Sequence, residues 1–393
     1  MSDCCSSKTE KACCGTANVT PEAWFTKMID HCLAYAREAK AQGRPVIGIM
    51  CEYTPREVIL AAGGVPVCLC GGSARMAEVA ERELPANLCP LIKSTYGYHL
   101  QHSNPFLEMA DLIVAETTCD GKKKMFELLA ESRPVHLLEL PQKSDDSFAR
   151  EYWLHEVLRL KAVLEERFAT SITDVALREA IGVMNRERTL RRSLAALMQA
   201  ENPPLTGLRL RQFNSSISGI PADLAQYELA LAQLQAQMEE RCAGTRIMLT
   251  GVPLPHGAER VLELIEAHGG LVVCQENCTG LRPLLEDVDA DASDPLRAIA
   301  EKYYHLPCSV MTPNTERLEL IKSLARDYHV EGIIELVWQA CLTYSVEAVA
   351  VKRCAEQELG IPYLQIQTDY APADSPRIAM RIEALIETIR GRI

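Results

Sequence analysis

Cysteine is the residue type in this sequence that is most able to do chemistry. The chain has 393 residues, and 16 of them are cysteines. A cysteine thiolate can act as a nucleophile, form a disulfide or bind a soft metal ion. The first 20 residues are polar and lack the apolar run of a secretion signal. In a long chain without such a signal, this many cysteines indicate metal or redox chemistry more often than disulfides.

The spacing of the cysteines disfavours the common compact metal sites. The pairs closest in sequence are Cys4-Cys5, Cys13-Cys14, Cys68-Cys70 and Cys274-Cys278. No C-x-x-C motif occurs, although zinc ribbons and ferredoxin-type runs depend on that motif. Any metal ligands must therefore come from loops that are far apart in the sequence.

The elements that position these cysteines alternate between strands and helices in two parts of the chain. Residues 20–145 and 241–393 each contain four short β-rich runs, with amphipathic helical patterns between them. The runs lie at 45–50, 65–70, 112–115 and 135–138, and at 246–251, 271–274, 332–337 and 363–367. Helical crossovers between strands give mostly parallel sheets. We therefore predict an α/β protein with two Rossmann-like halves, each built on a four-stranded, mostly parallel sheet.

Two further segments differ from these α/β parts. Residues 146–240 show helical periodicity throughout, as in "FAREYWLHEVLRLKAVLEERF", and no strand pattern interrupts it. We predict that they form a helical segment joining the two halves. Residues 1–19 are polar, and we predict a flexible tail there.

Six cysteines, three from each half, follow predicted strands or stand in loops beside helices. They are Cys51, Cys89, Cys119, Cys278, Cys308 and Cys341. In open parallel sheets, ligands bind beyond the carboxyl ends of the strands. We therefore expect these six in a cleft between the halves. Five others fall within predicted helices or strands and are interpreted as small buried hydrophobes, namely Cys32, Cys68, Cys242, Cys274 and Cys354.

Two sets of three thiolates favour iron–sulfur chemistry. Iron–sulfur clusters are held by cysteine thiolates, and a cubane held by only three of them keeps one iron open to another donor. Spacing alone leaves two alternatives, a thiol-based redox enzyme and cysteines with a purely structural role.

Several stretches of the chain resemble one known family. They are "GIMCEYTPREVILAAGGVPVCL", "NLCPLIKSTYGY", "TTCDGKKKM", "ENCTGLRPLLEDV", "IAEKYYHLPCSVMTPNTER" and "GIPYLQIQTDY". Over roughly residues 40–393 the sequence resembles the 2-hydroxyacyl-CoA dehydratase and benzoyl-CoA reductase family. It is most similar to the double-cubane-cluster branch, which consists of ATP-dependent reductases found in anaerobes.

The resemblance implies a cofactor and a first set of ligands. In the dehydratases each cluster subunit holds one [4Fe-4S] cluster on three cysteines. The positions that match this pattern here are Cys89, Cys119 and Cys341.

The double-cubane branch implies three further ligands. There a homodimer carries, in each subunit, two cubanes bridged by a sulfide, an [8Fe-9S] cluster held by six cysteines. The further matches in this sequence are Cys51, Cys278 and Cys308, with Cys70 at the end of a strand as the reserve candidate.

The resemblance also implies partners. Electrons would come from a separate activator that hydrolyses ATP and has its own [4Fe-4S] cluster, and they would reduce a small-molecule substrate. This chain has no G-x-x-x-x-G-K-[ST] and no G-x-G-x-x-G motif, so a nucleotide site of its own has no motif support. Two alternatives stay open: a single-[4Fe-4S] subunit of a 2-hydroxyacyl-CoA dehydratase, and a carrier that only hands electrons on.

Composition argues against two other classes of partner. Lysine plus arginine number 41 and aspartate plus glutamate 53, which gives a net charge of −12. Nucleic acid is therefore not expected, because its binding depends on neutralising phosphates. The most apolar window, residues 58–70, contains two glycines and a proline and is too short to span a membrane. We expect a cytoplasmic protein.

Reduction requires protons, and strand-end loops hold four candidate donors, Glu52, Tyr53, His256 and Glu276. We select two of them: Glu52 stands beside Cys51, and His256 takes in the second half the place that Cys51 has in the first. The competing interpretations are an ion pair of Glu52 with Arg56 and a helix-capping role for His256.

Three consecutive lysines follow Cys119 at the start of a predicted helix, where positive charge is unfavourable. They could offset the negative charge of a thiolate-bound cluster, meet an acidic face of the activator, or simply be solvated.

Overall fold

The structure is a computed structural model that describes residues 19–236 and 242–391. All of the predicted flexible tail except Val19 lies outside the described residues, and so do the adjacent cysteine pairs at positions 4–5 and 13–14. None of the twelve described cysteines is in a disulfide in this structure.

Two four-stranded sheets form the framework of the molecule. The first has the order β2-β1-β3-β4 and the second β6-β5-β7-β8, and all neighbouring strands are parallel. Their bounds are β1 Val46–Ile49, β2 Val65–Cys68, β3 Leu112–Glu116, β4 Val135–Leu138, β5 Thr245–Gly251, β6 Gly270–Glu276, β7 Gly332–Trp338 and β8 Tyr363–Thr368. Each strand overlaps a predicted run, so the prediction of two α/β halves with parallel sheets is confirmed.

The helices of the first half lie between and beside its strands. They are α1 Pro21–Thr26, α2 Met28–Ala41, α3 Arg56–Ala61, α4 Ala74–Ala80, α5 Pro90–Leu100, α6 Pro105–Met109 and α7 Asp120–Ala130. Their starts follow local chemistry: Ser73 and Asn104 accept hydrogen bonds from the first backbone N–H groups of α4 and α6. Prolines occupy the first turns of α5 and α6, where an N–H would have no partner within the helix.

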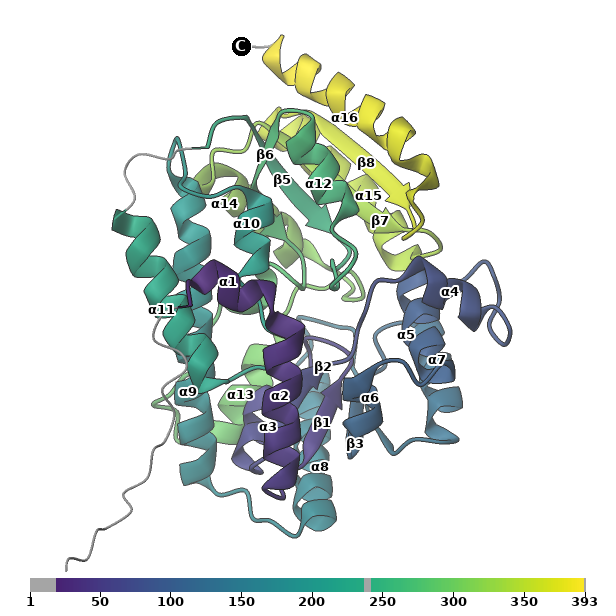
Figure 1. Cartoon of the computed structure of the whole chain (residues 1–393), viewed down its shortest axis with the longest axis vertical. Helices are drawn as coiled ribbons and strands as arrows, with labels where there is room; N and C mark the ends of the chain where they lie inside the picture. Colours follow the sequence, from purple (N-terminus) through teal and green to yellow (C-terminus); the bar gives the residue numbers. More distant parts are fainter. Residues whose placement is uncertain (1–18, 237–241, 392–393) are drawn as a thin grey trace, which may run out of the picture.

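The segment between the halves is helical, as predicted. It contains α8 Ser147–Phe168, α9 Asp174–Ala196, α10 Gly207–Gln212 and α11 Pro221–Ala236. It packs on both sheets: Trp153 of α8 shares a core with Ile49 of β1, and Tyr227 of α11 shares another with Met248 of β5. Figure 1 accordingly shows α9 and α11 alongside both halves. The exact domain boundaries stay a prediction.

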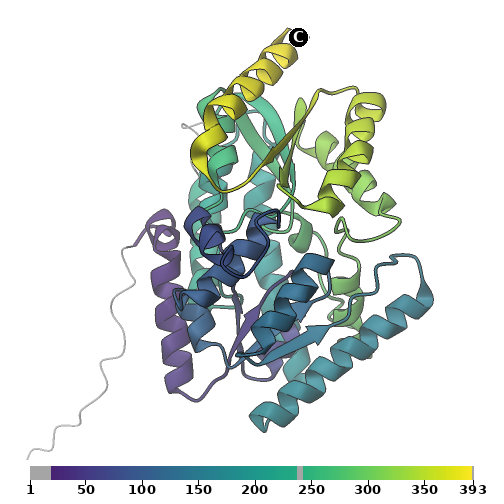
Figure 2. The ribbon, with the colours of Figure 1, turned by 90° about the vertical axis from the view of Figure 1, so that its right-hand side faces the viewer.

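The second half carries α12 Arg260–Ala267, α13 Pro295–Tyr304, α14 Thr315–Asp327, α15 Leu342–Arg353 and α16 Ser375–Arg390. Figure 2 shows this half, green to yellow, above the first half. One helix crosses over, because α13 packs against α8 in the core beneath the first sheet. Cys242 was predicted on a helix, and that is wrong: it lies in the irregular stretch before β5, where its N–H donates to the carbonyl of Pro203.

The two halves meet where their strands end. Gly71, which follows β2, pairs with His256, which follows β5, and the N–H of Gly72 donates to the carbonyl of His256 at 3.0 Å. A Cβ on Gly257, whose φ is +90°, would lie 2.6 Å from the carbonyl oxygen of Gly72. The contact therefore requires glycine, and it brings both sets of strand-end loops together. Within the two described ranges, no helix is long and apolar enough to cross a membrane.

Candidate cysteine cluster site

The six predicted cysteines fall into two groups, and the first consists of Cys89, Cys119 and Cys341. We call it the first trio. Each of the three stands directly before a helix, as the N-cap residue of α5, α7 and α15. The thiols of Cys89 and Cys341 are hydrogen-bonded to each other, and each of the two interacts electrostatically with Cys119. Three helix N-termini therefore converge on three thiols.

This arrangement favours negative charge on sulfur. The N-terminus of a helix carries positive partial charge and unpaired N–H groups. Backbone N–H groups of Leu91 and Ile92 accordingly contact Cys89, whose pKa is lowered chiefly by the hydrogen bond from Cys341. The pKa of Cys341 is raised by the same bond, and burial raises the pKa of Cys119.

The second group consists of Cys51, Cys278 and Cys308, and we call it the second trio. All three line one small cavity. Cys278 and Cys308 are hydrogen-bonded, which lowers the pKa of Cys308 to about 6 and raises that of Cys278. Burial raises the pKa of Cys51 to about 12. As in the first trio, the pKa of one thiol is lowered and the pKa values of its two partners are raised.

Each trio draws on both halves of the chain. The first trio takes two cysteines from the first half of the chain and one from the second half. The second trio takes one from the first half and two from the second half. The trios are also joined, because Ser309, next to Cys308, donates to the hydroxyl of Thr343, two residues after Cys341, at 3.1 Å. In both groups three soft donors converge without forming a disulfide, and this donor set fits an iron–sulfur group.

A buried arginine contacts the second trio. Arg282 donates from Nη1 to Sγ of Cys278 at 3.5 Å, and its Nη2 pairs with the Glu276 carboxylate at 2.6 Å. Although burial opposes the ionisation of Glu276, Arg282 and Arg317 hold the pKa of this carboxyl below its usual value. Glu276 is therefore an ionised carboxylate that orients Arg282.

Only one of the three consecutive lysines faces the cysteines. Lys122 donates to the carbonyl of Met50 at 3.0 Å, and although burial opposes its charge, Cys51 and other neighbouring acidic groups raise its pKa. Lys123 and Lys124 are exposed and pair with Asp120 and Glu127 on the same helix. The sequence run thus divides into one partly buried cation beside the thiols and two solvated ones.

Two buried groups near the thiols were not predicted from the sequence. Glu116 ends β3, is fully buried and contacts the hydroxyl of Thr54, and burial raises its pKa to about 7. The hydroxyl of Tyr370 is buried without a hydrogen-bond partner among the described residues, and burial and the nearby Cys89 raise its pKa. Both residues stand at or just after the end of a strand, which was a usable signal.

The two predicted proton donors have different surroundings. Glu52 forms the competing ion pair with Arg56, at 2.8 Å between Oε2 and Nη2. His256 is exposed, and the following helix begins at Arg260 with Glu259 as its N-cap and no capping side chain. The alternative that His256 caps this helix is therefore wrong. A proton-donor role for either residue stays a prediction.

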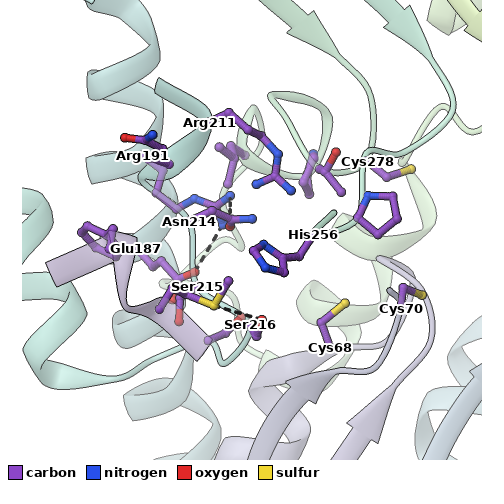
Figure 3. A pocket seen from close by; sticks show the side chains of 18 of the residues that line it. Cys68, Cys70, Glu187, Arg191, Arg211, Asn214, Ser215, Ser216, His256 and Cys278 are labelled. Atoms are coloured by element: carbon purple, nitrogen blue, oxygen red, sulfur yellow. Dashed lines mark hydrogen bonds and ion pairs between the residues drawn. The ribbon is translucent and has the colours of Figure 1, made fainter. Parts of the chain in front are cut away.

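A larger cavity of about 560 Å³ adjoins the second trio through Cys278. Figure 3 shows this cavity with Cys68, Cys70 and His256 along it. Cys68 was interpreted as a buried apolar residue, which is wrong. It ends β2 at the cavity wall, and a hydrogen bond from Cys70 lowers its pKa to about 7.

One group of possible metal ligands lies outside the two trios. His31, Cys32 and Asp223 have ligand atoms within 4.8 Å of one another. His31 Nε2 lies 3.0 Å from Asp223 Oδ1, and although burial opposes its charge, Asp223 raises the pKa of His31 to about 9. The indole of Trp24 donates to the same carboxylate oxygen at 2.8 Å. The group therefore acts as a buried ion pair that joins α2 to α11.

Comparison with known proteins shows which family this chain resembles. The family model described as 2-hydroxyglutaryl-CoA dehydratase, D-component, matches residues 51–389. The chain is 40% identical over 358 residues to the putative dehydratase subunit YjiM of Escherichia coli (strain K12), covering 90% of this chain and 93% of that protein.

Two more distant relatives cover most of the chain as well. The (R)-phenyllactyl-CoA dehydratase beta subunit of Clostridium sporogenes is 24% identical, over 88% of this chain and 92% of its own length. A benzoyl-CoA reductase subunit of Thauera aromatica is also 24% identical, over 82% and 85% respectively. The similarity therefore extends through both halves of the chain, and the range that the family model matches includes all six cysteines of the two trios.

Proposed function

This chain belongs to the family of the 2-hydroxyglutaryl-CoA dehydratase D-component, and on that premise we propose that it is an iron–sulfur reductase component with a double-cubane [8Fe-9S] cluster. The observation that carries the proposal is the presence of two cysteine trios, each built from both halves. A single [4Fe-4S] cluster needs only the first trio, Cys89, Cys119 and Cys341. The second trio, Cys51, Cys278 and Cys308, supplies a second, separate set of three donors.

The residues around the trios suit a cofactor of negative charge. The cluster, when bound, would supply low-potential electron transfer to a small molecule. The N-termini of α5, α7 and α15 stabilise the thiolates of the first trio through their N–H groups. Arg282 does the same for Cys278, and Lys122 places a cation near Cys51 and Cys119. Burial of Cys89 and Cys308 limits access of water.

We further propose that electrons come from a separate ATP-hydrolysing activator with its own [4Fe-4S] cluster, and that the chain works as a homodimer. Two observations support the proposal that ATP is hydrolysed by a separate protein. The chain carries neither of the two common nucleotide-binding motifs. Its relatives are named as subunits, among them the beta subunit of a dehydratase and one subunit of benzoyl-CoA reductase, which indicates assembly with other chains.

The second candidate is a single-cluster subunit of a CoA-ester dehydratase, which the names of several relatives favour. Iron and acid-labile sulfide, measured after purification without oxygen, separate the two. A double cubane gives about eight irons per chain and a single cubane about four. ATP-dependent reduction that requires an added activator would argue against a mere electron carrier.

Single substitutions test which cysteines are ligands. We expect Cys278→Ala and Cys308→Ala to lose about half of the iron, because each removes one of three donors for one cubane. The matched control is Cys274→Ala, since Cys274 is buried in β6 and faces a hydrophobic core. Full iron in both second-trio variants would refute the assignment of this trio.

A further inference from the structure

The cavity of about 560 Å³ beside Cys278 has a wall that the proposed function does not explain. Most pockets of this size hold a small molecule with a few fixed polar groups. Here the helical segment contributes three arginines, Arg188 and Arg191 from α9 and Arg211 from α10, and the strand-end loops contribute thiols to the same cavity. Figure 3 shows Arg211 and His256 pointing into the same part of the cavity.

Arg211 is a buried cation whose hydrogen bonds are incomplete. Its side chain is only 9% exposed, and its Nη2 donates to the carbonyl of Leu254 at 2.6 Å. Its Nε is buried and has no hydrogen-bond partner among the described residues. Its Nη2 forms an ion pair with Oε1 of Glu259 at 3.9 Å, which is beyond hydrogen-bonding distance. A buried N–H without an acceptor is costly, so a ligand acceptor fits here.

A second guanidinium stands close by. Burial lowers the pKa of Arg211, and although the Glu259 carboxylate opposes this shift, the positive charge of Arg191 contributes to it. Arg191 itself donates to Asn214 at 3.0 Å and lies 3.5 Å from Glu187. Two arginines that repel each other at the edge of a cavity are stabilised by an anion between them.

We propose that this cavity binds a small carboxylate, with Arg211 as the principal anion-binding residue and Arg191 and His256 beside it. The proposal deepens the proposed function and rests on it, since such a ligand would lie between the arginines and Cys278 of the second trio. A carboxylate matches the planar fork of a guanidinium through two parallel hydrogen bonds. A phosphate dianion fits less well, because carboxylates of the chain, including Glu187 and Glu259, also line the cavity.

Calorimetric titration of the full-length protein, purified without oxygen, tests the proposal. Crotonate is the probe, and crotonamide is its uncharged isostere. We expect crotonate to bind and crotonamide not to bind at the same concentrations. Arg211→Gln should weaken crotonate binding by about 10-fold or more, as expected for loss of a charged hydrogen bond. Arg37→Gln is the control, because Arg37 is exposed on α2 and does not line the cavity.

Two further measurements keep the proposal refutable. If Arg211→Gln does not fold, His256→Ala tests the proposal instead. The His256 side chain is exposed at the cavity, so its loss should weaken crotonate binding several-fold without disturbing the core. Equal binding of crotonamide, unchanged binding in the folded variants, or displacement of crotonate by inorganic phosphate or coenzyme A would each overturn the proposal. The iron count is independent of this titration, so the failure of one proposal is distinguishable from the failure of the other.

Discussion

Lys302 on α13 allows a quantitative test of how burial lowers the pKa of a lysine beside the large cavity. Its side chain lines the large cavity, yet the residue is only 3% exposed. Its Nζ donates to the carbonyl of Pro283 at 3.2 Å. Burial lowers the pKa of Lys302 to about 7, and the positive charge of Arg188 contributes to that shift. Replacing Lys302 with methionine keeps the length of the side chain and removes the charge.

The sign of the effect follows from proton binding. The pKa of Lys302 is lower in the folded chain than its ordinary value of 10.5. Between pH 7 and pH 10.5 the unfolded chain therefore binds more protons here, and the free energy of unfolding rises with pH across this window. Below pH 7 the full penalty applies, at most about 5 kcal/mol at about 1.4 kcal/mol per pKa unit.

Lys302→Met removes this penalty but leaves the Pro283 carbonyl without its donor, which costs about 1–3 kcal/mol. We expect the variant to be more stable than the native protein by about 2 kcal/mol at pH 6.5, and no more stable than it at pH 9.5.

The assay is urea unfolding without oxygen at several pH values, comparing the native protein with the variant. Lys143→Met is the control, because the Lys143 side chain is 68% exposed and should show no such dependence. A difference between Lys302→Met and the native protein that stays constant from pH 6.5 to pH 9.5 would refute the reasoning.

Two further predictions concern the cysteine site and the core. Lys122→Gln should lower the reduction potential of the bound cluster by on the order of 50 mV, because it removes a partly buried positive charge beside the thiols, while Lys124→Gln on the solvated face should not change it. Redox titration followed by electron paramagnetic resonance measures both potentials, and equal potentials in the two variants would contradict this. Gly97→Ala should lower the free energy of unfolding by about 2 kcal/mol or more, because its Cβ would lie 1.9 Å from the Met76 carbonyl oxygen. At Gly182 a Cβ would meet open space, so Gly182→Ala should raise the free energy of unfolding slightly. Urea unfolding compares the two variants, and equal effects would disprove the packing argument.

The local sequence was sufficient to predict the two sheets and the helical segment. Continuous apolar runs such as "LIVAE" and "GIIELV" form buried central strands, because a parallel sheet is covered on both faces. The helical segment was also predictable, because apolar residues recur with helical spacing along α8 and α9 and no strand pattern interrupts them. The local pattern failed at Cys242, which follows the helical run but lies outside any helix.

The candidate site was predictable only in part. The rule that ligands gather at the carboxyl ends of strands selected six cysteines, and these are the six that form the two trios. The rule by itself could not say which of the six are neighbours, and the grouping into two sets of three came from the family resemblance. Cys68 lies in a strand as predicted, but it is only partly buried, because the end of β2 borders the cavity.

By itself, the sequence determined the elements, the parallel sheets and the set of cysteines at strand ends, because each depends on residues that are close together along the chain. The family resemblance had already grouped Cys341 with Cys89 and Cys119. Only the tertiary structure decided that Lys122 alone of the three consecutive lysines turns inward, and that Arg211 lines a cavity together with Cys278. These contacts depend on how the two halves and the helical segment pack together. Packing brings together groups hundreds of residues apart, which no local pattern records.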